Sequence, residues 1–126
     1  KKFITIKIIN SKSVTRAKKI AFSIANSPLV KTAVAGQDPN WGRIIMGIGK
    51  SGEQIDQEKL VIKFGELLVA ENGKISDEYD EQKLKEYMEF DSILIEVNLN
   101  QGHDSFECYT CDFTHDYIDI NADYRN

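Results

Sequence analysis

The sequence predicts an α+β fold with two layers, in which amphipathic helices pack on a mixed or antiparallel β-sheet. Three observations lead to this prediction. Segments with alternating apolar residues, which is the pattern of strands, are interspersed with segments of helical periodicity. Short turn signals connect strands as hairpins, which is typical of α+β folds. The length of 126 residues suits one domain with its own core, so residues 1–126 are expected to form a single domain.

The first 35 residues are predicted to contain a strand, a helix and a second buried strand. Apolar residues alternate from Phe3 to Ile9, so this strand is expected to be buried on at least one face. After the capping residue Ser13, a helical stripe of apolar residues follows: Ala17, Ile20, Ala21 and Ile24. Residues 26–28, Asn-Ser-Pro, are expected to end this helix. The apolar run 29–35 is interpreted as a buried strand, although its start could continue as helix.

Residues 35–43, Ala-Gly-Gln-Asp-Pro-Asn-Trp-Gly-Arg, form the most informative segment. Asp38 or Asn40 can cap a helix that carries Trp41 on its apolar face, and Pro39 suits the first turn of that helix. A strand-to-helix turn of this kind exposes backbone N–H groups, which can hold a carboxylate or another anion. The alternative is a well-capped turn in which Trp41 is a core anchor.

Residues 60–88 are predicted to form a pair of strands followed by a helix. The runs 60–64 and 67–70 have strand composition, and Asn72-Gly73 is a hairpin-turn signal. A short helix is expected at residues 80–88, with three residues facing inward: Leu84, Tyr87 and Met88.

Residues 93–112 are predicted to form a second hairpin. Alternating apolar residues from Ile93 to Leu99 predict one strand. Residues 100–102, Asn-Gln-Gly, are expected to turn the chain into the strand at 105–112. Thr114 can then cap a final helix.

The composition argues against nucleic-acid and membrane partners. The net charge is −4, and lysines and arginines are dispersed along the chain rather than clustered. No apolar stretch is long enough to span a membrane, and no signal peptide is visible. Because the chain opens inside a predicted strand and without Met, it is expected to be a piece of a longer or processed protein.

Two cysteines and two histidines near the C-terminus invite a metal-site interpretation, which the predicted strand disfavours. Cys108 and Cys111 are spaced like half of a zinc site, and His103 and His115 flank them. Residues three apart on a strand point to opposite faces, so these thiols can close neither a tetrahedral site nor a disulfide. No metal ligand is therefore assigned. Two reduced thiols are expected, which fits a cytoplasmic protein.

No catalytic set is visible in the chain, because no serine lies in a nucleophile elbow and both histidines lie in polar, turn-like surroundings. Four aspartates near the C-terminus lack the glycine and glutamate of an EF-hand loop: Asp112, Asp116, Asp119 and Asp123. Capping and solvated positions explain them without calcium.

Two long motifs nevertheless resemble a known family. The segment 29–44, which includes the Gln-Asp-Pro-Asn-Trp-Gly-Arg turn, looks like the signature of ornithine acetyltransferases, also called glutamate N-acetyltransferases. The segments 109–117, Tyr-Thr-Cys-Asp-Phe-Thr-His-Asp-Tyr, and 120–125, Ile-Asn-Ala-Asp-Tyr-Arg, resemble the family's C-terminal end. The likeness runs over nearly the whole chain and keeps the family's order.

The resemblance implies an acyl transfer from N-acetylornithine to glutamate in arginine biosynthesis. Members are made as a precursor that cuts itself before a threonine, whose free amine and hydroxyl then act as base and nucleophile. The family's threonine motif is absent here, and its Gly-Glu-Gly-Ala element would fall just before Lys1. The resemblance therefore implies the C-terminal part of the second, or beta, chain, which contains no catalytic residue and is inactive alone.

Two substrate-binding positions of the family match residues of this chain. One is Asn121, and the other is Asn126, where the family usually has Ser or Thr, so that a carboxamide replaces a hydroxyl. The resemblance implies no cofactor, although some members also accept acetyl-CoA as the acetyl donor. It implies as protein partners the alpha chain and a second alpha-beta pair, which together form a heterotetramer.

Two alternatives stay open at this point. The first is a related self-processing aminopeptidase, which would apply similar N-terminal nucleophile chemistry to peptides. The second is a non-catalytic α+β interaction module that docks partners through exposed strand edges.

Overall fold

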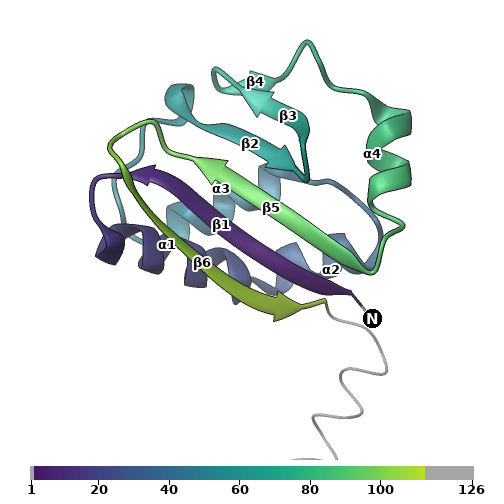
Figure 1. Ribbon diagram of the computed structural model, residues 1–126, viewed down its shortest axis with the longest axis horizontal. Coiled ribbons are helices and arrows are strands. Elements are labelled where there is room, and N and C mark those ends of the chain that lie inside the picture. Colours follow the sequence, from purple (N-terminus) through teal and green to yellow (C-terminus); the bar gives the residue numbers. More distant parts are fainter. Residues whose placement is uncertain (1, 113–126) are drawn as a thin grey trace, which may run out of the picture.

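The computed structural model describes residues 2–112, which form a β-sheet and several short helices (Figure 1). The elements are, in chain order, β1 (Phe3–Ser11), α1 (Val14–Ala25), α2 (Pro28–Ala35), α3 (Trp41–Lys50), the 3-10 turn η1 (Gln57–Lys59), β2 (Val61–Phe64), β3 (Leu67–Glu71), β4 (Lys74–Ile75), α4 (Glu81–Tyr87), β5 (Ser92–Asn98) and β6 (Asp104–Cys111).

The described strands form one mixed, six-stranded sheet in the order β4-β3-β2-β5-β1-β6. The central strands β1 and β5 run parallel, and the other neighbouring pairs are antiparallel. Figure 1 shows α1, α2 and α3 together behind one face of this sheet, with α4 beside the end of β2 and β3. The prediction of a two-layer α+β fold is confirmed.

The core lies between the helices and the sheet face that they cover. Alternate residues of the central strands enter it, so that Ile4, Ile6 and Ile8 of β1 are completely buried. From α1, the predicted stripe of Ala17, Ile20, Ala21 and Ile24 meets them from the other side. Each buried isoleucine contributes about 1.5–3 kcal/mol to folding, which makes this inner layer the main source of stability.

The predicted strand at residues 29–35 is wrong, because these residues form helix α2. The Ser27 hydroxyl accepts a hydrogen bond from the Val30 backbone N–H (3.3 Å), and Pro28 occupies the first turn. Both are helix-start signals, so α2 begins shortly after α1 ends. Its three buried apolar residues fall at helical spacing on one face: Val30, Ala33 and Val34.

The second predicted hairpin is also wrong, although both of its strands exist. β5 and β6 are not neighbours, because β1 lies between them. The connection crosses the end of β1, where Leu99 donates its N–H to the Ile9 carbonyl (3.0 Å) and Gly102 to the Asn10 carbonyl (2.9 Å). Strand β6 therefore pairs antiparallel with β1 at the edge of the sheet.

The first predicted hairpin region and the helix after it are confirmed. β2 and β3 pair antiparallel, and the Asn72-Gly73 turn then leads into the short strand β4. Both turn residues have positive φ angles, 53° and 76°, as a tight hairpin turn requires. In the helical segment, Leu84 and Met88 are buried and Tyr87 is half-buried. The helix predicted after Thr114 lies outside the described residues.

Within residues 2–112, no helix is long and apolar enough to cross a membrane.

Candidate functional site

The segment 35–43 is a helix-to-helix turn rather than the predicted strand-to-helix turn. It leaves α2 through hydrogen bonds that the Gly36, Gln37 and Asp38 N–H groups donate back to carbonyls of the last α2 turn, at 2.8 to 3.0 Å. Gln37 has a φ angle of 58°, a left-handed conformation that side chains rarely adopt. The chain thus changes direction within a few residues, and Gly36, Gln37 and Asp38 are exposed to solvent.

Of the two predicted capping residues, Asp38 and Asn40, it is Asn40 that caps helix α3. Its side-chain oxygen accepts from the Arg43 N–H (3.1 Å), while its amide donates to the Asp38 carboxylate (3.1 Å). The Arg43 guanidinium reaches across to the Leu29 carbonyl (2.9 Å) and so ties α3 to the start of α2. Trp41 is half-buried and packs against the core, so it anchors the turn without lying fully inside. Anion binding at this helix start stays a prediction.

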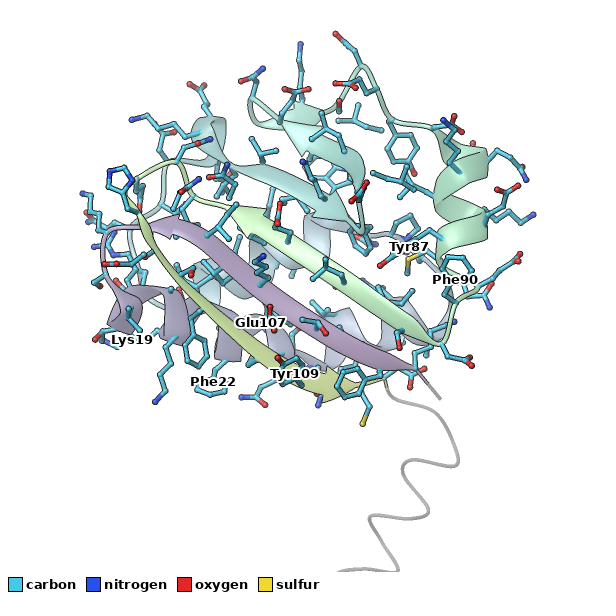
Figure 2. All side chains as sticks on the ribbon, viewed as in Figure 1. Lys19, Phe22, Tyr87, Phe90, Glu107 and Tyr109 are labelled. Carbon is cyan, nitrogen blue, oxygen red and sulfur yellow. The ribbon has the colours of Figure 1, made fainter. Side chains whose placement is uncertain are left out.

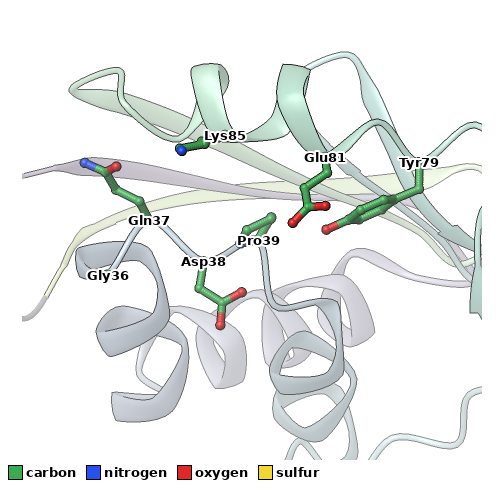
Figure 3. Close-up of a pocket in the computed structure, with 7 residues that line it drawn as sticks. All are labelled: Gly36, Gln37, Asp38, Pro39, Tyr79, Glu81 and Lys85. Carbon is green, nitrogen blue, oxygen red and sulfur yellow. The ribbon is translucent and has the colours of Figure 1, made fainter.

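A pocket of about 450 Å³ opens beside this turn (Figure 3). One wall is the turn itself, and the other is the start of α4, which lies more than 40 residues later in the sequence. The lining residues are Gly36, Gln37, Asp38, Pro39, Tyr79, Glu81 and Lys85. Figure 3 shows Glu81 beside the ring of Tyr79, with Lys85 above Gln37.

The pocket carries charges of both signs. Partial burial raises the pKa of Tyr79, and the nearby carboxylates of Glu81 and Asp38 raise it further, so the phenol stays protonated at neutral pH. A protonated phenol can donate a hydrogen bond, two carboxylates can accept, and Lys85 can pair with an anion. This donor and acceptor set suits a small polar ligand, but it does not contain a nucleophile with an adjacent base.

The sequence does not single out the α4 side of this pocket. Residues 77–81, Asp-Glu-Tyr-Asp-Glu, have the composition of a solvated helix start, and Asp80 does cap α4 by accepting from the Lys83 N–H (3.0 Å). Tyr79 and Glu81 also face the 36–39 turn, a contact that only the tertiary structure creates. No local sequence signal could have paired these two segments.

The cysteines lie on opposite faces of β6, as the spacing predicted. Cys108 is buried on the helix side and Cys111 is half-buried, and both are free thiols. Burial raises the pKa of the Cys108 thiol, and the carboxylate of Glu107 adds to this shift. No group of three potential metal ligands occurs among residues 2–112. His103 is exposed there, whereas His115 lies outside the described residues.

The two predicted substrate residues, Asn121 and Asn126, lie outside the described residues, so their geometry is not part of this site. Asp112, the last described residue before them, is fixed in place by a buried hydrogen bond. The Asp112 carboxylate is buried and accepts the Lys2 backbone N–H (2.8 Å), while Lys2 Nζ donates to the Phe90 carbonyl (2.6 Å). The C-terminal motif that begins at residue 109 thus starts from a fixed position at the end of β6.

Comparison with known proteins gives a consistent result over the whole chain. A family model described as the ArgJ family matches residues 1–126. The arginine biosynthesis bifunctional protein ArgJ of Brucella melitensis is 48% identical over 126 residues, which are 100% of this chain and 30% of that protein. The protein of the same name from Ruegeria pomeroyi is 49% identical over 125 residues, or 99% of this chain and 31% of that protein.

A solved structure agrees with these sequence matches. The crystal structure of the arginine biosynthesis bifunctional protein ArgJ from Bacillus halodurans superimposes with a TM-score of 0.88 at 36% identity. The match covers 98% of this chain and 58% of that chain. This chain therefore spans about a third of the length of the curated relatives that it matches.

Proposed function

This chain belongs to the ArgJ family, and from that membership we propose that it is the C-terminal domain of a glutamate N-acetyltransferase of arginine biosynthesis. One observation carries the proposal: the family match extends over residues 1–126 without interruption. The relatives that match it are named arginine biosynthesis bifunctional proteins, which places them in that pathway by name.

The proposed reaction moves an acetyl group from N-acetylornithine to glutamate in two steps. The hydroxyl of an N-terminal threonine attacks the acetyl carbonyl, the ornithine amine leaves, and an acetyl-threonine ester forms. The glutamate amine then attacks that ester and releases the threonine hydroxyl. The nucleophile is proposed to belong to a part of the protein outside this chain. No cofactor is needed for either step, and acetyl-CoA is an alternative acetyl donor in bifunctional members.

This chain is proposed to contribute substrate recognition rather than bond making. Asn121 and Asn126 would contact the amino-acid end of the substrate, where carboxamides can pair with an amine and with a carboxylate. The firm attachment of Asp112 to Lys2 supports this role, because the segment that carries both asparagines follows a buried anchor.

The proposed protein partners are the alpha chain and a second alpha-beta pair, in the cytoplasm. The free thiols Cys108 and Cys111 are compatible with such a reducing compartment.

A chimaera tests the proposal. This chain would replace the matching residues of the Brucella melitensis relative, which is 48% identical to it. We expect the chimaera to transfer acetyl from N-acetylornithine to glutamate, because the upstream part would supply the nucleophile. The same chimaera with its nucleophilic threonine changed to alanine is the control and should be inactive. A folded chimaera that cleaves peptides but transfers no acetyl group would favour the aminopeptidase alternative and contradict the proposal.

A further inference from the structure

Three segments that are far apart in the sequence meet at one corner of the sheet, where β1 begins and β6 ends (Figure 1). Lys2 directly precedes β1, Asp112 directly follows β6, and residues 90–91 precede β5. The Phe3 N–H donates to the Asp91 carbonyl (2.8 Å), so the start of β1 is attached to the chain that leads into β5. This corner therefore connects three consecutive strands of the sheet.

Lys2 and Asp112 exchange two hydrogen bonds, and together with the Phe90 carbonyl they form a group that is here called the corner clasp. The Lys2 N–H donates to Asp112 Oδ1 (2.8 Å), and the Asp112 N–H donates to the Lys2 carbonyl (3.2 Å). Lys2 Nζ donates to the Phe90 carbonyl (2.6 Å). Because Lys2 and Asp112 are 110 positions apart in the sequence, only the folded chain brings them together.

Both charged side chains of the corner clasp are buried, which is unusual for lysine and aspartate. Lys2 is 8% exposed and Asp112 is 1% exposed. Burying a charge is unfavourable, and here a charge-assisted hydrogen bond to a backbone group offsets the loss of water. Apolar residues of similar volume often stabilise such a position as well or better, so stability alone does not account for the charged groups. What the hydrogen bonds add is direction, because each one fixes one segment relative to another.

The Phe90 carbonyl is itself held in place. The Phe90 ring packs edge-to-face on the ring of Tyr87, with centroids 5.8 Å apart (Figure 2). The Tyr87 hydroxyl in turn accepts a hydrogen bond from the Leu94 N–H of β5 (2.7 Å). Lys2 thus donates to a residue that is attached to α4 and, through Tyr87, to β5.

We propose that Asp112 is a positioning residue for acetyl transfer, which acts through Lys2. In the chimaera, the upstream part would join β1 through Lys2, and the segment that carries Asn121 and Asn126 would follow β6 through Asp112. The corner clasp connects these two points directly. It thereby sets the start of the proposed substrate-binding segment relative to the part that carries the proposed nucleophile. This inference rests on the proposed function and adds to it a residue that touches neither the substrate nor the nucleophile.

The test separates the glutamate step from the acetyl-enzyme chemistry as such. The chimaera is loaded with p-nitrophenyl acetate, which has no amino-acid end. The threonine hydroxyl attacks the acetyl carbonyl, p-nitrophenolate leaves, and the threonine amine takes the hydroxyl proton. The amine of either glutamate or hydroxylamine then attacks the ester and gives up a proton to the departing threonine oxygen, which releases N-acetylglutamate or acetohydroxamic acid. Hydroxylamine has no amino-acid end, so its reaction does not need contacts from residues 121 and 126.

Loss of the corner clasp should impair only the acceptor that needs those contacts. Asp112→Ala should slow the reaction with glutamate about 10- to 100-fold and leave the reaction with hydroxylamine within about twofold, because a displacement of about 1 Å is enough for a loss of this size. Asp112→Asn should keep the glutamate rate within about threefold of the parent, since its carboxamide oxygen can accept the same Lys2 N–H. A general loss of structure would slow both acceptors equally.

Hydrogen exchange, measured by mass spectrometry on the same chimaera, reports on the corner clasp without any activity. Peptides that contain Lys2 should exchange faster in Asp112→Ala than in the parent or in Asp112→Asn, because the Lys2 N–H loses its acceptor. Val69→Ala is the matched control, since Val69 is completely buried on β3, which β2 and β5 separate from β1. It should lower stability but change neither the ratio of the two rates nor the exchange at Lys2.

A second variant serves if Asp112→Ala does not fold. Lys2→Met removes only the link to the Phe90 carbonyl and should slow the glutamate reaction selectively, by about 3- to 10-fold.

The outcomes distinguish this inference from the proposed function. An active parent whose folded Asp112→Ala or Lys2→Met variant keeps the parent's glutamate rate would overturn the positioning role alone. Equal losses with both acceptors, an Asp112→Asn variant as slow as Asp112→Ala, or unchanged exchange at Lys2 in Asp112→Ala would do the same. A parent chimaera that transfers no acetyl group would instead overturn the proposed function, and the positioning role would fall with it.

Discussion

Asn121 is the residue for which we propose the most specific role, contact with the amino-acid end of the substrate. In the chimaera described above, Asn121→Ala should remove one hydrogen bond to a charged group of the substrate, at a cost of about 1.5–3 kcal/mol. The specificity constant for acetyl transfer should fall roughly ten- to a hundredfold. Asn126→Ala should lower it less, because asparagine already departs from the hydroxyl residue that is usual there.

Melting temperatures serve as the control for both asparagine variants and should stay close to that of the parent chimaera. If Asn121→Ala retains the parent's kinetics, this chain does not contact the substrate at that position and acts as a scaffold.

Trp41 shows how far a single residue can be predicted. The sequence presents it as a core anchor, and the structure places it half-buried against the core, at the first position of α3. Trp41→Ala should therefore lower the free energy of unfolding by about 2 kcal/mol, less than the loss for a fully buried tryptophan. Chemical denaturation measures this change.

Met46→Ala, on the same helix, is the matched control for Trp41→Ala. Met46 is 51% exposed, so its truncation should change the free energy of unfolding by less than about 0.5 kcal/mol. Equal effects of the two substitutions would show that Trp41 contributes through the local helix rather than through packing on the core.

At the scale of elements, Gly102 explains how the chain passes from β5 to β6 across the end of β1. A Cβ atom at this position would lie 2.5 Å from the Ser11 carbonyl oxygen, which belongs to the backbone and cannot move freely. Gly102→Ala should therefore destabilise the chain by about 2–3 kcal/mol.

A second glycine provides the comparison for Gly102. Gly49 lies in α3 with no atom within 4 Å of a Cβ placed there. Gly49→Ala should stabilise the chain by about 0.5–1 kcal/mol, because alanine is the better helix former. Thermal unfolding of both variants gives the comparison, and a Gly102→Ala variant as stable as the wild type would mean that the crossing relaxes easily.

The same crossing shows why one predicted element pairing is wrong. Residues 93–112 contain two strands and a turn, and periodicity and turn residues predict each of these in place. Their partner cannot be predicted in the same way, because β1, which lies between them, comes from the other end of the chain. Local pattern determines that a strand forms, whereas the choice of neighbour depends on contacts between residues about 90 positions apart.

The prediction for α2 is wrong for a different reason. Its apolar run of about seven residues has the length of a buried strand or of a short helix, and periodicity alone does not separate the two. Ser27 and Pro28 are visible as boundary residues in the sequence, but they fit the end of α1 as well as the start of α2. Two helices that follow each other with so short a connection share their boundary residues, so one signal serves two elements.

At the scale of the whole molecule, the described residues contain a closed core and a pocket whose lining residues include no nucleophile with an adjacent base. Buried residues of α1, α2 and α3 pack against those of the central strands in one hydrophobic core. A continuous core of this kind is what a folded domain needs for stability. The candidate site lies between the 36–39 turn and the start of α4, and the nucleophile is proposed to belong to a part of the protein outside this chain. The family signature was recognisable from the sequence, whereas the pocket beside it depends on tertiary contact.

A complete core, together with the proposal that the nucleophile lies outside this chain, predicts how the isolated chain behaves. The isolated chain should unfold cooperatively, yet it should transfer no acetyl group from N-acetylornithine to glutamate. Residues 2–112 contain one histidine, His103, and within these residues it has no hydrogen bond to a serine, threonine or cysteine that it could activate as a nucleophile. Calorimetry tests the fold, and a coupled assay of acetylglutamate formation tests the activity on the same sample. Folded but inactive protein is the expected result. Robust turnover by the chain alone would mean that its own residues supply a nucleophile, and the proposed division of labour with an upstream threonine would then be wrong.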